Sequence, residues 1–282
     1  MKRPAKIVLL LAIALLLAVP AAAIILAGCG ESKHGDSGQD DTVQLEAGAQ
    51  VSTGQTATAS GDSVFSGTGL PIVPGRQLVY DSNIPGTPAT VSFDLNGPWR
   101  FASGPVEATL TVAMVAKDRA PDQRQFGDAS VAAATSWNSA AAAEYNFQSR
   151  DETSWYSYGR SFTDGRPTVT YSSRSRALVF PMSAGDSWVD VYTERQNGRI
   201  ADVTAENRVL SRNELTVPAG TFNAWLLQTR VTSRSAGATT TTTDYSWFVP
   251  GVGRAAEIIS QPGERDDQFS TAKAFYRLKS YK

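Results

Sequence analysis

The chain has 282 residues, of which 41% are hydrophobic, 19% charged and 9% aromatic, so it can bury a core without disulfides or structural metals. Without Lys2, Arg3 and Lys6, which belong to the first 28 residues, 23 basic residues remain against 27 acidic ones. This balance argues against a nucleic-acid-binding protein. Cys29 is the only cysteine and His34 the only histidine, which excludes a Ser-His-Asp triad and a zinc site built on these residue types.

The first 28 residues have the anatomy of a secretion signal. Residues 1–6 carry the positive charges, residues 7–26 are almost wholly aliphatic, and small residues precede Cys29. The box from Leu26 to Cys29, Leu-Ala-Gly-Cys, resembles the processing site of bacterial lipoproteins. The resemblance implies a signal peptide over residues 1–28, cleavage before Cys29, and acyl chains such as palmitate on its thiol. An uncleaved apolar helix of this length could also span a bilayer. Both interpretations place the rest of the chain outside the cytoplasm.

Residues 29–70 predict a lipidated N-terminus followed by a disordered tether. They are rich in Gly, Ser, Thr, Asp, Gln and Ala, and have scarcely an aromatic side chain to bury. A flexible coil of about 40 residues has a root-mean-square span of ~35 Å. The tether would therefore hold a folded domain clear of the membrane that receives the anchor, either the cell membrane or, where the host has one, the outer membrane.

From residue 71 the pattern changes to short apolar alternations punctuated by glycine and proline, which is typical of an antiparallel β protein. We expect one mainly β domain over residues 71–282, a curved antiparallel sheet forming a half-barrel or a β-sandwich with at most one or two short helices. Asp128 to Glu144 is the one helix candidate, an alanine-rich stretch that Asp128 could cap. The predicted strands are 77–81, 90–95, 108–115, 176–180, 187–195, 200–210, 214–217, 221–232, 239–248, 255–260 and 269–281.

The best-defined local structure is a tight hairpin at residues 217–222. Pro218 suits the first central position of a type I turn, and Gly220 can close a three-residue loop with a bulge. The strand that follows is apolar on both faces, so it should lie centrally in the sheet or cover a cavity. Its two faces are Phe222, Ala224 and Leu226 on one side, and Trp225, Leu227 and Val231 on the other. The five threonines at 239–243 predict a further strand.

Two groups of carboxylates beside aromatic residues are candidates for sugar chemistry. The first is Glu144, Asp151 and Glu152. The second is set by strand alternation, which puts Asp186, Trp188, Asp190, Tyr192 and Glu194 on one face and Val189 and Val191 on the other. The simpler interpretation of the second group is a solvent-facing surface whose valines supply the core. We therefore expect no enzyme and no catalytic residue, with a carboxylate-based glycosidase as a remote alternative.

Residues 178–259 carry a further resemblance. Its motifs are Phe180 and Pro181 followed by residues 184–188, then residues 216–222 with Ala224, and finally Tyr245 and Trp247 before residues 250–253. These motifs resemble a family of uncharacterised secreted bacterial β proteins, similar in general shape to lipoprotein-carrier half-barrels. The resemblance implies a curved antiparallel sheet around an apolar cavity, and it carries over no catalytic residue.

These observations predict a non-catalytic, membrane-anchored cell-envelope lipoprotein that binds an apolar or amphipathic ligand or serves envelope maintenance. The candidate ligand-binding residues are Phe222, Trp225, Leu227 and Trp247. A carbohydrate-binding protein is an alternative, with Asp186, Trp188, Asp190 and Tyr192 in an exposed groove. An interaction scaffold is another, and it would expose an apolar patch or an unpaired strand edge. We expect the membrane as a partner through the lipid on Cys29, and no nucleic acid, metal or cofactor besides that lipid. The oligomeric state is left open.

Overall fold

The computed structural model describes residues 64–282 except 68–69, 71, 105 and 265, so Cys29 and the predicted signal sequence lie outside the described residues. The strands are β1 (Gln77–Ser82), β2 (Ala89–Thr90), β3 (Trp99–Arg100), β4 (Ala108–Ala116), β5 (Val131–Trp137), β6 (Glu144–Arg150), β7 (Ser154–Phe162), β8 (Val169–Val179), β9 (Ser187–Gln196), β10 (Arg199–Val217), β11 (Gly220–Ser235), β12 (Ala238–Val249), β13 (Gly253–Ser260) and β14 (Thr271–Tyr281). Two 3-10 turns, Lys117–Arg119 and Gln123–Gln125, are the helical elements of the described chain. No helix within these described ranges is long and apolar enough to cross a bilayer.

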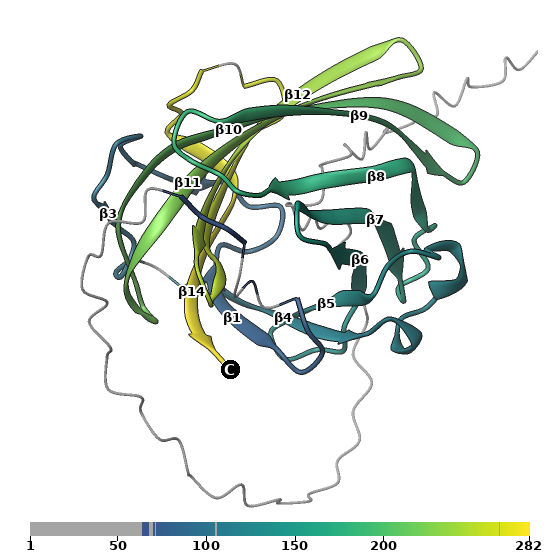
Figure 1. Ribbon diagram of the computed structural model, residues 1–282, viewed down its shortest axis with the longest axis horizontal. Coiled ribbons are helices and arrows are strands. Elements are labelled where there is room, and N and C mark those ends of the chain that lie inside the picture. The colour runs from purple at the N-terminus through teal and green to yellow at the C-terminus, as the bar shows by residue number, and fades with distance from the viewer. Residues whose placement is uncertain (1–63, 68–69, 71, 105, 265) are drawn as a thin grey trace, which may run out of the picture.

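The strands form a closed barrel (Figure 1). β1 and β4 to β14 follow one another in antiparallel pairs, and β14 pairs with β1 from Leu78 opposite Tyr281 to Ser82 opposite Tyr276, which gives twelve strands in the wall. The prediction of a mainly antiparallel β fold is confirmed. The sheet differs from the predicted half-barrel or sandwich in that it closes, and closure leaves no unpaired edge strand at either end of the sheet.

The predicted helix at residues 128–144 is wrong, because this stretch contains β5 and the first residue of β6. Ala132, Ala133 and Ala134 are all buried in the barrel wall, so tertiary packing overrides the helix propensity of alanine. Asn138 and Ser139 have φ values of 46° and 64° and turn the chain between the two strands. Asparagine is one of the residue types enriched at positive φ, so Asn138 suits this turn.

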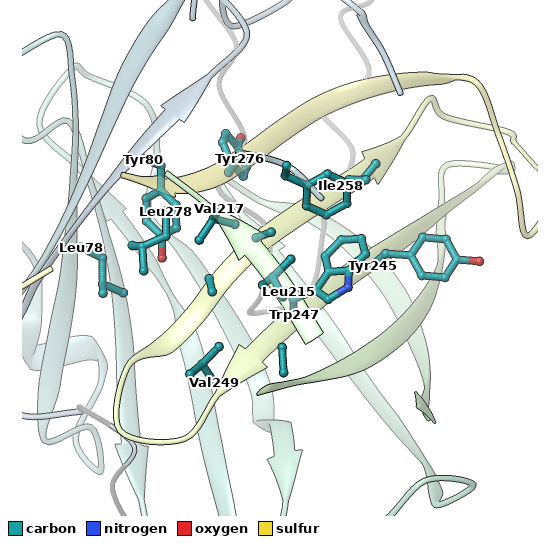
Figure 2. Packing of buried hydrophobic residues seen from close by; sticks show 14 of the residues in the cluster. Leu78, Tyr80, Leu215, Val217, Tyr245, Trp247, Val249, Ile258, Tyr276 and Leu278 are labelled. Carbon is teal, nitrogen blue, oxygen red and sulfur yellow. The ribbon is translucent and has the colours of Figure 1, made fainter. Parts of the chain in front are cut away.

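The connection from β1 to β4 crosses the outside of the barrel. β2 pairs with β14, and β3 runs parallel to the end of β10. Phe93, Trp99 and Phe101 from this connection pack against Trp247, with ring centroids 5.9, 5.8 and 5.0 Å away. Figure 2 shows Trp247 in this cluster with buried residues of β10 and β13. The barrel therefore has an apolar core on its outer face as well as one inside.

β11 confirms the two-faced pattern predicted for it. Leu226 belongs to the cluster under the β1–β4 connection, whereas Trp225 and Leu227 pack inside the barrel with Phe65 and Leu70. Phe65 is itself bound to Met182 by two backbone hydrogen bonds of 2.8 and 2.9 Å. Phe65, which lies within the stretch predicted as tether, thus takes part in the folded structure.

The hairpin from β10 to β11 forms where it was predicted. Val217 pairs with Gly220, so two residues rather than three lie between the paired positions. Gly220 has φ +137°, a conformation that a side chain would strain. The predicted threonine strand is also confirmed, since residues 239–243 lie within β12.

Candidate functional site

The interior of the barrel has one apolar wall and one polar wall. Directly paired residues in neighbouring antiparallel strands face the same side of the sheet. Leu78 and Tyr80 of β1 pair with Val112 and Leu110 of β4, and this register continues into β5. It then reaches the polar positions of β6, where Asn146 pairs with Ala133. The alternation carries Glu144 and Gln148 onto the same inward face.

A cavity of about 60 Å³ lies between these walls inside the barrel. One water needs roughly 10–15 Å³ of such a cavity, so it has room for about four to six water-sized groups. Its lining residues are Leu70, Ile72, Leu78, Tyr80, Leu110, Val112, Met114, Ala133, Thr135, Asn146, Gln148, Trp155, Gly253, Arg254, Glu257 and Tyr276.

Two charged residues line the cavity, and they bind each other. Arg254 Nη1 lies 2.9 Å from the carboxylate of Glu257, which also accepts a 3.2 Å hydrogen bond from Ser246 Oγ. Burial raises the pKa of Glu257 to about 7, although the guanidinium of Arg254 opposes this shift. Tyr80 Oη donates to the carbonyl of Arg254 at 2.8 Å, which holds that backbone against β1. Above its pKa, Glu257 therefore neutralises the charge of Arg254.

Among the lining residues, Gln148 and Trp155 each have a buried polar atom without a hydrogen-bond partner. These atoms are Oε1 of Gln148 and Nε1 of Trp155, whose residues are 4% and 7% exposed. Gln148 pairs with Ser157 across β6 and β7, and Trp155 precedes Ser157 by two residues, so the two side chains are diagonal neighbours on the inner face. Both atoms are fully buried, and leaving each unpaired costs about 1–3 kcal/mol.

A second inward-facing polar group contains further ionisable residues. Arg160 Nη1 lies 3.7 Å from Glu144 Oε1, and Arg166 Nη1 lies 3.7 Å from Glu144 Oε2. Burial raises the pKa of Glu194 to about 7, with Arg160 opposing the rise. Asp244 is fully buried, and burial together with the charge of Glu257 raises its pKa well above the usual range. The barrel therefore encloses several carboxyl groups that bind protons unusually tightly.

The orientation predicted for β9 is reversed with respect to solvent. Val189 and Val191 are 53% and 69% exposed, whereas Asp190, Tyr192 and Glu194 are buried. The interpretation that the valines supply the core is therefore wrong. The alternation itself is correct, but this barrel turns its polar face inward, so the side of the strand that faces solvent is the apolar one.

The residues predicted for a sugar-binding groove instead bridge two strands. Backbone pairing between β8 and β9 covers residues 169–171 and 194–196 alone. Further along, the Asp190 carboxylate accepts hydrogen bonds from the backbone N–H and Nε of Arg176 at 3.0 and 2.8 Å. Trp188 Nε1 donates to the Arg176 carbonyl at 3.0 Å. We call this side-chain-bridged contact the β8–β9 seam. Asp186 lies at its end and accepts from Ser183 N at 2.7 Å.

The predicted apolar ligand-binding residues are split between the two faces of the barrel. Trp225 and Leu227 lie inside the barrel in a packed cluster, and neither of them lines the cavity. Trp247 lies on the outer face beneath the β1–β4 connection, and Phe222 is half-buried against Tyr281 with ring centroids 6.2 Å apart. The structure thus does not bring these four residues together.

The cavity-lining residues Asn146 and Gln148 were missed in the sequence. The signal was the strict alternation of Glu144 to Gln148, in which polar residues flank Tyr145 and Phe147. This alternation was hidden because its first residue ends the alanine-rich stretch predicted as a helix. Phe147 stacks on Phe126 outside the barrel at 3.9 Å between centroids, which places the polar residues inside.

The first carboxylate group does not form a glycosidase pair. Glu144 begins β6 and Asp151 follows its end, so at ~3.3 Å per residue they lie roughly 23 Å apart along the strand. Glycosidases need separations of about 5–10 Å. Asp151 instead fixes a turn by accepting from the N–H groups of Thr153 and Ser154 at 2.8 and 2.9 Å. Among the described residues, no three of His, Cys, Asp and Glu are grouped so as to hold a metal ion.

Comparison with known proteins places a recognised sequence region within this barrel. Residues 177–255 match a family model described as DUF3108-like, which overlaps the segment at 178–259 whose motifs are set out above. The match covers less than half of the chain. No curated protein matches the sequence.

Two solved structures resemble the fold at low identity. One is a Bacteroides fragilis protein provisionally described as exported, with a YmcC-like fold. It has a TM-score of 0.46 and 11% identity, and the match covers 76% of this chain and 98% of that one. The other is a Parabacteroides distasonis protein provisionally described as a lipoprotein, with a TM-score of 0.42, 12% identity, and coverage of 76% and 97%. Similarity at this level says nothing about a shared role.

Proposed function

We propose that this protein is a non-catalytic cell-envelope lipoprotein, anchored to the membrane through Cys29, whose barrel binds a small amphipathic ligand in its interior cavity. The observation that carries the proposal is the mixed lining of that cavity. Leu78, Leu110 and Met114 supply an apolar wall, and Asn146 and Gln148 supply polar groups on the wall formed by β6. Binding sites for small molecules combine mostly apolar surface with a few placed polar groups in this way.

The size of the cavity limits the ligand. Room for about four to six water-sized groups suits a small molecule or the tip of a longer chain, and a whole acyl chain does not fit. The absence of histidine and cysteine from its lining favours binding over catalysis. The proposal therefore concerns a short amphipathic group held inside the barrel.

The anchor rests on the sequence from Leu26 to Cys29 and has its own test. Mass spectrometry of the N-terminal peptide from the membrane-extracted protein should find a lipidated cysteine as the first residue. A chain that begins at Met1 with an unmodified thiol would show that the anchor does not exist. Labelling with a palmitate analogue should be lost in Cys29→Ser.

An interaction role is the second candidate, and the exposed outer face of β9 favours it. Val189 and Val191 are 53% and 69% exposed and lie on the outer face of β9 at and beside the β8–β9 seam. Apolar residues gathered at the surface often mark a protein contact. If this surface binds a partner, Val191→Asp should abolish crosslinking in cells, and unchanged crosslinking would dismiss the role.

Carbohydrate binding has less support. Trp188 and Asp190 are engaged by Arg176, and Tyr192 is 3% exposed, so these side chains do not form an open groove.

The ligand proposal is tested by filling the cavity. Ala133 lines it, and Ala133→Leu adds volume there, whereas Ala113→Leu on β4 adds the same volume on the outward face as a matched control. Each full-length protein is purified from its host, and its organic extract is compared by mass spectrometry. A small compound should be enriched with the wild type and Ala113→Leu and be lost from Ala133→Leu. Identical extracts from all three would dismiss an interior ligand.

A further inference from the structure

We propose that a second pocket, on the outside of the barrel, binds an organic anion with an apolar body, of which a medium-chain carboxylate is the simplest example. This pocket has a volume of about 470 Å³ and lies between the β1–β4 connection and the outer face of β13 and β14. No residue lines both this pocket and the interior cavity of the proposed function. Pockets that bind small molecules measure about 300–1,000 Å³, so its size suits a ligand that the interior cavity cannot hold.

The floor of the pocket is apolar. Glu257 and Tyr276 pair across β13 and β14 and line the interior cavity, so the neighbouring pair of Ile258 and Phe275 faces the outer side of the sheet. Phe101 of the β1–β4 connection packs on Phe275 with ring centroids 5.4 Å apart. Ile258, Phe275 and Phe101 all line the pocket. The body of a ligand would therefore contact aliphatic and aromatic side chains.

Arg277 brings a buried positive charge to this pocket. Its Nη2 donates to the carbonyl of Gly104 at 2.7 Å and its Nη1 donates to the carbonyl of Ser103, and both of these residues line the pocket. The guanidinium thus lies at the pocket wall, although Arg277 is only 3% exposed. Asp81 Oδ2 is 4.0 Å from Arg277 Nε, and Asp81 Oδ1 is 3.2 Å from Lys279 Nζ, so one carboxylate is shared by two cations.

The charges around the pocket favour an anionic ligand. Arg100 lines the pocket, is exposed, and forms no ion pair or side-chain hydrogen bond within the described part of the chain. Glu107 is the acidic residue of the lining, and its carboxylate accepts a 3.1 Å hydrogen bond from the backbone N–H of Ile84. Together with Asp81 and Lys279, three cationic side chains stand against two anionic ones. A carboxylate head would balance this excess and could bind a guanidinium through two parallel hydrogen bonds.

Hydrogen bonds fix the walls of the pocket. Asn83 Oδ1 accepts from the backbone N–H of Phe275 at 2.9 Å, and its Nδ2 donates to the carbonyl of Lys273 at 3.2 Å. The backbone N–H of Phe101 donates to the carbonyl of Thr216 at 2.7 Å. These bonds tie the connection to β14 and β10. A pocket formed in this way requires little ordering of the chain when a ligand binds.

The two sites differ in the length of chain they accept. Octanoate has about ten non-hydrogen atoms, which need roughly 100–150 Å³ if each takes the space of one water. This volume exceeds the interior cavity of about 60 Å³ and fits the outer pocket of about 470 Å³. Eight-carbon probes therefore report on the outer pocket.

The test uses three photoactivatable probes that share an eight-carbon chain bearing a diazirine and end in a carboxylate, a hydroxyl or an ammonium group. Each is irradiated with the full-length protein at about pH 7.5, where the carboxylate and the ammonium are both charged, and the labelled peptides are mapped by mass spectrometry. The carboxylate should label peptides of the β1–β4 connection and β14, about fivefold more than the alcohol and more still than the ammonium. Excess octanoate should suppress this labelling. Equal labelling by the three probes, or carboxylate labelling confined to other parts of the chain, would overturn the inference.

Two variants assign the labelling to the pocket. Arg100→Gln removes the unpaired charge and should reduce carboxylate labelling about fivefold. Arg208→Gln is the matched control, since it removes an exposed arginine of β10 outside the pocket, and it should change nothing. Ser92→Trp fills the pocket from an exposed position and should abolish labelling by all three probes. Carboxylate labelling that survives both Arg100→Gln and Ser92→Trp would contradict the assignment.

A third variant separates this site from the proposed function. Ala133→Leu fills the interior cavity and should leave labelling of the outer pocket unchanged, because Ala133 does not line that pocket. Loss of labelling in folded Ala133→Leu would place the probe inside the barrel and overturn the outer site. Failure to find an interior ligand, in contrast, would leave the outer site standing.

Discussion

Two glutamates inside the barrel, Glu194 and Glu257, hold their protons to a much higher pH than free glutamate does. Burial raises the pKa of each to about 7, against an ordinary value of 4.5. Because the unfolded chain releases these protons at lower pH, the folded state binds more protons between about pH 4.5 and 7. The free energy of unfolding must therefore fall as the pH rises through this window.

The magnitude follows from the shift in pKa. One unit is worth about 1.4 kcal/mol, so each glutamate contributes on the order of 3 kcal/mol, which is lost as the pH rises from about 4.5 to above 7. The two groups lie beside Arg160 and Arg254, which soften the effect but do not reverse it. Such a loss is a large fraction of the 5–15 kcal/mol typical of a folded domain.

Urea unfolding of the full-length protein at about pH 5, 6, 7 and 8 measures this dependence. Glu194→Gln and Glu257→Gln should each flatten the curve, because a neutral amide no longer titrates. Glu206→Gln on β10 is the control, since its side chain is exposed, and it should leave the slope unchanged. Stability that stays constant or rises from pH 5 to 8 would refute the assignment of these two buried protons.

Three further predictions concern the barrel wall. Gly159→Ala should destabilise the protein by about 3 kcal/mol or more, because φ is +133° there and a Cβ would lie 2.2 Å from the carbonyl oxygen of Val169. Gly198→Ala, which has open space around its Cβ, should cost about 1 kcal/mol. Equal losses of stability in urea unfolding would contradict this prediction. Trp247→Ala should cost about 3–5 kcal/mol and Val191→Ala less than about 0.5 kcal/mol, and similar melting temperatures would argue against an outer core. Asp190→Ala should speed amide hydrogen exchange at residues 172–179 of β8, which have no backbone pairing with β9, and should leave the amides of β11 protected. Unchanged exchange at residues 172–179 would show that the seam does not depend on this carboxylate.

The sequence predicted those strands whose two faces differ clearly or whose turns are unambiguous. β11 was identified because Pro218 and Gly220 mark its start and apolar residues follow on both faces. β5, β6 and β7 escaped because several of their inward positions are alanine or polar, such as Ala133, Asn146 and Ser157, so the usual rule that the core side is apolar pointed the wrong way. The same rule led to the wrong prediction of which face of β9 is exposed to solvent.

Closure of the barrel could not be read from local patterns. It depends on β1 pairing with β14, where Leu78 lies opposite Tyr281 across almost the whole folded chain. The cavity depends in turn on that closure, because Tyr80 and Tyr276 reach it from these two strands. Periodicity reports which residues share a face of one strand, and only the assembled sheet decides whether that face is enclosed.

The central claim is that the barrel interior binds a small amphipathic molecule. A crystal structure of the full-length protein soaked with 3-iodo-1-propanol tests it most directly, because the iodine can be located by its anomalous scattering. The iodine should lie among Leu110, Val112 and Met114, with the hydroxyl group toward Gln148. An iodine signal confined to the outer surface, with the interior unchanged at saturating probe, would contradict the claim.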